Sequence, residues 1–187
     1  EPYIDADDED TEKQRIKRIV DVEGEETLYH YLDAVSVDID YVEIGDHTVQ
    51  YYETFTDRMS LDEDDPEGRR VNYSINYDPE NDHWTYTVYT YEKDSSFLIS
   101  TEQYLYDPDT EEQGLLLAIT HFEKFINEDG EGRRRATDVV TYDTDAEQWN
   151  IVRYQYAYEH TDSVESTQRC RYNLETKEFG NPFAEDF

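Results

Sequence analysis

Positive charge is scarce in this sequence. Only 16 of its 187 residues are Lys or Arg, against 48 Asp or Glu, and the formal net charge is −32. This balance excludes nucleic-acid binding through a basic surface, which needs clustered cations to neutralise phosphates. Long apolar runs are also missing, since no stretch approaches the roughly 18 residues of a membrane-spanning helix. We therefore expect no nucleic-acid partner and no transmembrane segment.

Cysteine and glycine are scarce too. The single cysteine, Cys170, excludes an intrachain disulfide. In an alternating run, Cys170 lies on the same strand face as Tyr172 and Leu174. This placement predicts a small buried side chain rather than a reactive thiol. The seven glycines are isolated from one another, which excludes phosphate-binding and dinucleotide-binding loops. Neither a G-x-S-x-G nor an H-E-x-x-H motif is present, and we expect no enzyme.

Aliphatic core residues are few, and tyrosine replaces them. Leu, Ile, Val and Phe make up about 20% of the chain, which is the boundary below which a highly charged chain is usually disordered. The 18 tyrosines add the apolar area that this count misses. Because they fall in patterned positions, we expect a folded chain.

Apolar residues alternate with polar ones over most of the sequence. Val71, Tyr73, Ile75 and Tyr77 show the pattern, which is typical of strands with one buried and one wetted face. Strands are predicted over 35–44, 47–56, 69–77, 84–92, 96–106, 115–125, 136–142, 149–159 and 165–174. Hairpin turns are predicted where Asp or Asn follows Tyr, at Asp78, Asp107, Asp143 and Asn173.

The start of the chain differs from the rest. Residues 1–12 are predicted to be an acidic arm, and residues 13–187 a single antiparallel β domain. Within residues 10–20, Ile16, Ile19 and Val20 share a helical face, which predicts a short helix. One or two further helical turns are predicted within 25–34.

Together these features predict a mostly β protein. We expect an antiparallel β-meander that forms a barrel or a strongly curved sheet, because closure removes exposed edges. A β-sandwich is the alternative. Six residues of one hairpin recur 65 positions later, from Arg70 and Trp84 to Arg135 and Trp149. The recurrence indicates either an old duplication or two hairpins that solve the same packing problem.

Acidic turns are the candidate cation sites. The loop that starts at Asp107 has its glycine at the eighth position instead of the sixth, so it is not an EF-hand. Irregular weak cation sites stay open, and solvated turn acids are the favoured interpretation. The residues concerned are Asp62, Asp64, Asp65, Asp107, Asp109 and Glu111. The five histidines show no spacing typical of a transition-metal site.

Aromatic and arginine clusters are the candidate ligand or interface residues. The tyrosines are Tyr86, Tyr89, Tyr91, Tyr154, Tyr156 and Tyr158, and the arginines are Arg133, Arg134 and Arg135. The tyrosines could line a ligand site or an interface, although core and sheet surface are their commonest places. The arginines could hold an anion, and pairing with carboxylates on neighbouring strands is the favoured alternative.

The types of charged residue indicate that the protein works in concentrated salt. A net charge of −32 opposes compaction, and concentrated salt relieves this because the Debye length falls to about 3 Å at 1 M. The chain has 11 Arg against 5 Lys, together with abundant Asp. In composition the whole chain resembles proteins of extremely halophilic archaea, a resemblance that identifies no family.

For function we expect a non-enzymatic secreted or cell-surface protein of a halophile. It would act as a structural or interaction module that assembles with itself into a filament or envelope layer. Two alternatives stay open: a small-ligand-binding β-barrel similar to lipocalins and lipoprotein carriers, and an acidic DNA-mimic inhibitor. No cofactor is expected beyond weakly bound K⁺, Na⁺, Ca²⁺ or Mg²⁺. The start at Glu1 favours a processed extracellular chain, and a cytoplasmic location is the alternative if Glu1 is a trimmed end.

Overall fold

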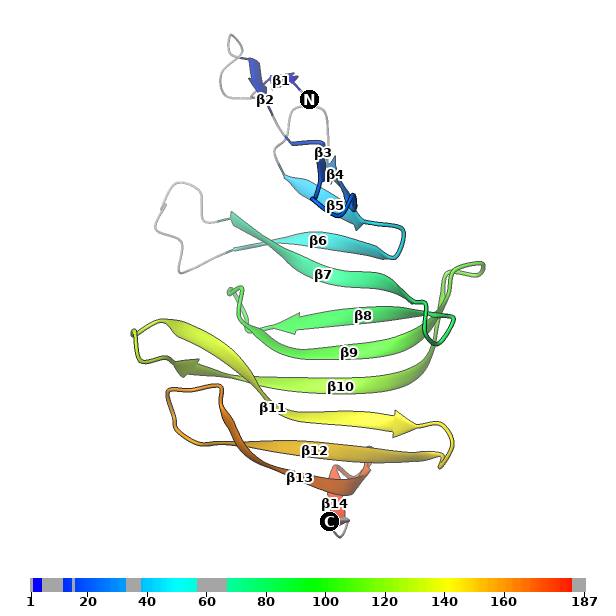
Figure 1. The fold of residues 1–187 in the computed structure, drawn as a ribbon, viewed down its shortest axis with the longest axis vertical. Helices are drawn as coiled ribbons and strands as arrows, with labels where there is room; N and C mark the ends of the chain where they lie inside the picture. The colour runs from blue at the N-terminus through cyan, green and yellow to red at the C-terminus, as the bar shows by residue number, and fades with distance from the viewer. Residues whose placement is uncertain (1, 5–11, 15, 33–37, 57–66, 183–187) are drawn as a thin grey trace. The chain divides into compact units, whose positions relative to one another are not determined.

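The alternating pattern forms β-strands along most of the chain. The computed structural model describes residues 2–4, 12–14, 16–32, 38–56 and 67–182 (Figure 1). The strands are β1 (Pro2–Ile4), β2 (Glu12–Gln14), β3 (Arg18–Val20), β4 (Glu26–Tyr31), β5 (Ile39–Ile44), β6 (Thr48–Thr56), β7 (Glu67–Asp78), β8 (His83–Tyr91), β9 (Leu98–Asp107), β10 (Glu112–Ile126), β11 (Gly132–Asp143), β12 (Gln148–Tyr156), β13 (Val164–Asn173) and β14 (Glu178–Pro182).

The strands form an antiparallel meander, as predicted. From β3 to β14 each strand is hydrogen-bonded to the next one along the chain, in a sheet of twelve strands whose order can be followed in Figure 1. β1 and β2 pair separately. The order is open, with β3 and β14 as its end strands, so the sheet is not closed into a barrel. It is also one sheet rather than the two of a sandwich.

The described residues contain no helix. Residues 10, 11 and 15 of the predicted helix lie outside the described residues, and residues 18–20 form β3, which pairs with β4. A turn joins these strands: the Asp21 carboxylate accepts the Glu23 and Glu25 amides, and Gly24 has a φ of 90°. Cross-strand pairing therefore outweighs the local helical pattern. The helical turns predicted within 25–34 are likewise replaced by β4, with residues 33 and 34 outside the described part.

The four predicted hairpin turns all form, and by the predicted chemistry. The Asp78 carboxylate accepts the Glu80 amide at 2.9 Å, and Asp143 accepts the Asp145 amide at 3.1 Å. Asp107 and Asn173 accept the amide two residues on in the same way. Each loop then closes with a residue in the left-handed region, which turns the chain into the next strand. These residues are Asp82, Glu111, Glu147 and Lys177.

The contacts divide the chain into two compact units. Unit 1 comprises Glu1–Val88, Asp94–Ser96 and Tyr106–Glu112, and unit 2 comprises Tyr89–Lys93, Phe97–Leu105 and Gln113–Phe187. Unit 2 has a core of Val140, Ile151 and Cys170, which are 1%, 3% and 4% exposed. Cys170 is buried with a free thiol, as predicted.

Few side chains are buried in either unit. Among the described residues, seven apolar side chains are buried, together with Ser74 and Thr85. Most other strand residues are half-buried or exposed. Tyrosine therefore takes the place that aliphatic residues hold in a thicker core.

The described part of the chain has no helix long and apolar enough to span a membrane.

Candidate functional site

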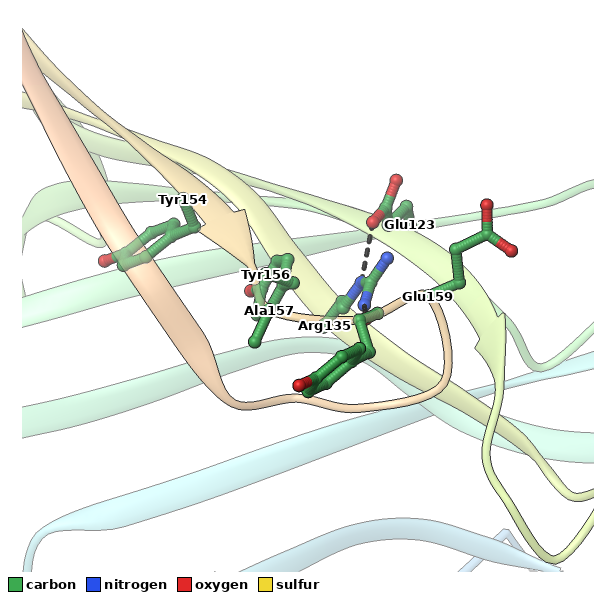
Figure 2. Close-up of a pocket in the computed structure, with 7 residues that line it drawn as sticks. Glu123, Arg135, Tyr154, Tyr156, Ala157 and Glu159 are labelled. Carbon is green, nitrogen blue, oxygen red and sulfur yellow. Dashed lines mark hydrogen bonds and ion pairs between the residues drawn. The ribbon is translucent and has the colours of Figure 1, made fainter.

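A shallow pocket lies in unit 2 where β10, β11 and β12 meet the loop after β12 (Figure 2). Its volume is about 490 Å³. The lining residues are Glu123, Arg135, Tyr154, Tyr156, Ala157, Tyr158 and Glu159. β10 supplies the first of them, β11 the arginine, and β12 with the following loop the rest. The pocket therefore gathers four of the residues predicted from sequence.

Arg135 is the centre of the pocket, and hydrogen bonds from its Nε and Nη1 hold the guanidinium. Its Nε donates to Glu123 Oε1 at 2.7 Å, an ion pair visible in Figure 2. Its Nη1 donates to the backbone carbonyls of Tyr158 and Thr161 at 3.1 and 2.6 Å. The guanidinium also lies 4.2 Å from the Tyr156 ring centroid. With a side chain only 12% exposed, Arg135 fastens the loop to the sheet and is not an open anion site.

The tyrosines around Arg135 are held unequally. Tyr156 donates its hydroxyl to the Ala136 carbonyl, and burial raises the pKa of this phenol, an effect that the nearby Arg135 opposes. Tyr158 is 71% exposed. In Figure 2 the Tyr154 ring points away from Arg135. The pocket thus presents one fixed phenol, an exposed tyrosine and two carboxylates, one of which is paired with Arg135.

The other predicted arginines also pair locally. Arg133 donates to Glu131 Oε2 at 2.6 Å on an exposed turn, and this hydrogen bond lowers the pKa of Glu131. Arg134 lies over the Phe122 ring at 5.5 Å. Tyr89 and Tyr91 do not line this pocket. Of the three arginines, only Arg135 pairs with a carboxylate on a neighbouring strand; Arg133 pairs within its own turn and Arg134 lies over an aromatic ring.

The Arg135 arrangement occurs a second time, in unit 1. Arg70 donates its Nε to Glu53 Oε1 at 2.7 Å and its Nη1 to the Ser95 carbonyl, and it lies 4.6 Å from the Phe55 ring centroid. Arg70 and Arg135 are 65 residues apart. Arg135 likewise lies 4.9 Å from the Phe125 ring centroid, so in each case a glutamate on the preceding strand, a phenylalanine and a loop carbonyl surround the guanidinium. We call these two arrangements the arginine clamps.

The described residues hold no group of three potential metal ligands. Asp107 uses its carboxylate to accept the Asp109 amide, and Glu111 closes the same turn with a φ of 57°. These turn acids are exposed. Asp62, Asp64 and Asp65 lie outside the described residues. The weak cation sites stay a prediction.

One histidine has a partner that could orient it. His121 Nδ1 lies 2.7 Å from Asp138 Oδ1 across β10 and β11. A carboxylate bound to imidazole in this way orients the base of many hydrolases. Among the described residues, however, no hydroxyl or thiol is hydrogen-bonded to the other ring nitrogen of His121.

A row of stacked rings crosses six strands of unit 1. It consists of His30 on β4, Tyr41 on β5, Tyr51 on β6, Tyr73 on β7, Tyr86 on β8 and Tyr106 on β9. Successive centroids are 4.0, 5.5, 4.4, 4.9 and 5.9 Å apart. We call this the ring row. Of its members, sequence analysis singled out only Tyr86, because the others become neighbours only once the register is known.

The ring row is an electrostatically distinct strip. Burial, neighbouring phenols and Asp40 raise the pKa of Tyr51, and burial, Tyr86, Tyr106 and Asp40 raise the pKa of Tyr73. At the β4 end, His30 Nε2 lies 2.9 Å from Glu43 Oε1. All six rings are half-buried, so the strip is partly open to solvent.

Comparison with known proteins adds no relative. No protein-family model matches the chain, and no curated protein matches it.

Proposed function

We propose that this chain is a non-enzymatic interaction module that works in concentrated salt, at the surface of a halophile or outside its cells. The observation that carries the proposal is the net charge of −32 on a chain patterned to fold. In dilute solution this charge would oppose the compact state, and the small buried core offers little to offset it.

The placement of the charges supports this proposal. Acids serve as turn acceptors, as at Asp78 and Asp143, or stand exposed in the loops. Two of the arginines, Arg70 and Arg135, pair with glutamates and clamp loops to strands. Acids dispersed in this way are typical of a strongly hydrated surface rather than of a single binding site.

The end strands support the interaction role. β3 and β14 each have a strand partner on one side only in the described sheet. An unpaired strand edge can add a strand from another chain by backbone hydrogen bonds. We propose that such pairing joins copies into a filament or envelope layer, once salt screens their mutual repulsion.

The salt requirement has a direct test. We expect the circular dichroism signal of the β-sheet to be complete in about 3 M KCl and largely lost in about 0.1 M KCl. In the dilute salt the carboxylates repel one another over about 10 Å, instead of about 3 Å or less. An equally concentrated sugar solution controls for crowding and water activity. An unchanged spectrum in dilute KCl would contradict the salt requirement.

Self-assembly has a separate test. We expect size-exclusion chromatography in about 3 M KCl to show species larger than a monomer that grow with protein concentration. Replacing Val20 in β3 by Pro removes a backbone donor on the side of this end strand that faces away from β4, and we expect it to reduce assembly. A strictly monomeric wild type over the concentration range would contradict the assembly proposal while leaving the salt requirement intact.

A further inference from the structure

The ring row presents a regular surface to solvent. Its first four ring pairs are stacked, with interplanar angles of 7°, 26°, 16° and 21°. Stacked rings turn their faces toward one another and their edges outward. Because the rings come from consecutive strands, the row runs across the strands and not along them.

A lower strip runs beside the row. Side chains two residues apart on a strand share a face, so Glu43, Val49 and Ile75 stand on the same face as Tyr41, Tyr51 and Tyr73. The register pairs Glu43 with Val49 and Val49 with Ile75, so these three side chains also line up across the strands. Valine and isoleucine are shorter than tyrosine, and the row therefore stands as a wall above an apolar shelf.

The charge around this wall is negative. Glu43 stands at the β5 end of the shelf, and Asp40 acts electrostatically on both Tyr51 and Tyr73. The chain as a whole carries −32. A cation with an apolar body is complementary to both the shelf and its surroundings.

We propose that the ring row and its shelf bind an elongated, planar, aromatic cation whose long axis lies across the strands. The flat body packs against Val49, Ile75 and the tyrosine wall, and the charge lies toward Glu43. The shelf spans β5 to β7, or two strand spacings of about 4.8 Å, and ends at Tyr86, which the register pairs with Ile75; its length of about 10 Å accommodates one fused ring system. The inference goes beyond the proposed function, because it requires neither self-assembly nor a cell-surface location.

Thioflavin T, a planar aromatic cation, is a suitable probe. We expect its fluorescence to rise saturably when it is titrated with the protein in about 3 M KCl, where charge acts only at short range. Its uncharged demethylated analogue has nearly the same shape, and we expect it to bind at least about threefold more weakly. Absence of saturable binding to folded protein would overturn the proposal.

Variants locate the site. We expect Tyr51→Leu combined with Tyr73→Leu to weaken binding at least about tenfold, since it removes the middle of the wall. The matched control is Tyr154→Leu combined with Tyr158→Leu in unit 2, which removes two tyrosines outside the row and should leave affinity unchanged. Circular dichroism verifies that each variant is folded. An equal loss in the control, or no loss in the row variant, would overturn the assignment.

A conservative variant covers the case in which the leucine variant fails to fold. Tyr51→Phe combined with Tyr73→Phe keeps both rings and removes both hydroxyls, and we expect affinity to stay within about twofold of wild type. A larger loss would mean that the hydroxyls and not the ring wall hold the probe, which would overturn the proposal. Loss of binding by folded protein leaves the salt requirement untouched, so the two proposals fail separately.

Discussion

The hairpin of β7 and β8 in unit 1 and the hairpin of β11 and β12 in unit 2 have the same framework. Tyr77 lies against Trp84 with ring centroids 5.1 Å apart, and Tyr142 lies against Trp149 at the same distance. In both hairpins the turn follows an acidic side-chain acceptor. The 65-residue repeat in the sequence therefore corresponds to a repeated local structure.

The two hairpins share the Tyr–Trp pair next to the turn and differ in the other cross-strand pairs, one of which is buried in unit 2 only. Ile75 pairs with Tyr86 in unit 1, and Val140 pairs with Ile151 at the equivalent positions of unit 2. The aliphatic pair is buried, at 1% and 3% exposure, whereas the pair containing tyrosine is half-buried. Hairpins that share the Tyr–Trp contact and the acidic turn can thus carry either a buried aliphatic pair or part of a half-buried ring row.

The largest expected effect is the loss of stability when a residue of these two pairs is truncated to alanine. Ile151→Ala should lower the free energy of unfolding by about 2–4 kcal/mol, because it leaves a cavity in a buried cluster. Ile75→Ala should cost about half as much or less, since solvent already reaches that side chain. Urea unfolding in concentrated KCl measures both. Equal losses would contradict the difference between the units.

The arginine clamps should have a smaller effect. Arg135→Met keeps most of the apolar stem but removes the Glu123 pair and two carbonyl contacts, and we expect a loss of about 1–3 kcal/mol. Arg70→Met should cost somewhat less, because the Arg70 side chain is 18% exposed against 12% for Arg135. Urea unfolding measures both, and proteolysis should also show earlier cleavage near Thr161 in the Arg135 variant. A larger loss at Arg70 would reverse the expected order.

The smallest effect concerns alkaline pH. The pKa values of Tyr51 and Tyr73 are raised in the fold. Their contribution to stability is therefore fully present below the ordinary tyrosine pKa of about 10 and is lost as pH rises through their folded pKa values. A hydrogen bond to Glu102 raises the pKa of Tyr104 to about 12, so this phenol should ionise late as well.

Phenolate absorbance in a pH titration measures this effect. Compared with wild type, the titration curve of Tyr73→Phe should lack one phenol that ionises above about pH 10. Disappearance of an early-ionising phenol instead would mean that the row is more open than the structure shows.

Local patterns predicted much of this fold. The alternation at Val71–Tyr77 and the Asp-containing turns act between residues close in sequence, so they were visible in advance. Cys170 was placed correctly for the same reason. The ring row was not visible, because Tyr41 and Tyr73 become neighbours only through the register of β5, β6 and β7. The N-terminal segment was misassigned since Arg18–Val20 gains more from pairing with β4 than from a short isolated helix.

The central claim is that one hairpin framework carries a buried aliphatic pair in unit 2 and a partly open aromatic pair in unit 1. Amide hydrogen exchange in about 3 M KCl tests it most directly, by comparing the amides of Val140 and Ile151 with those of Ile75 and Tyr86. We predict slow exchange in both hairpins and the slower exchange at Val140 and Ile151. Faster exchange at Val140 and Ile151 than at Ile75 and Tyr86 would contradict the claim.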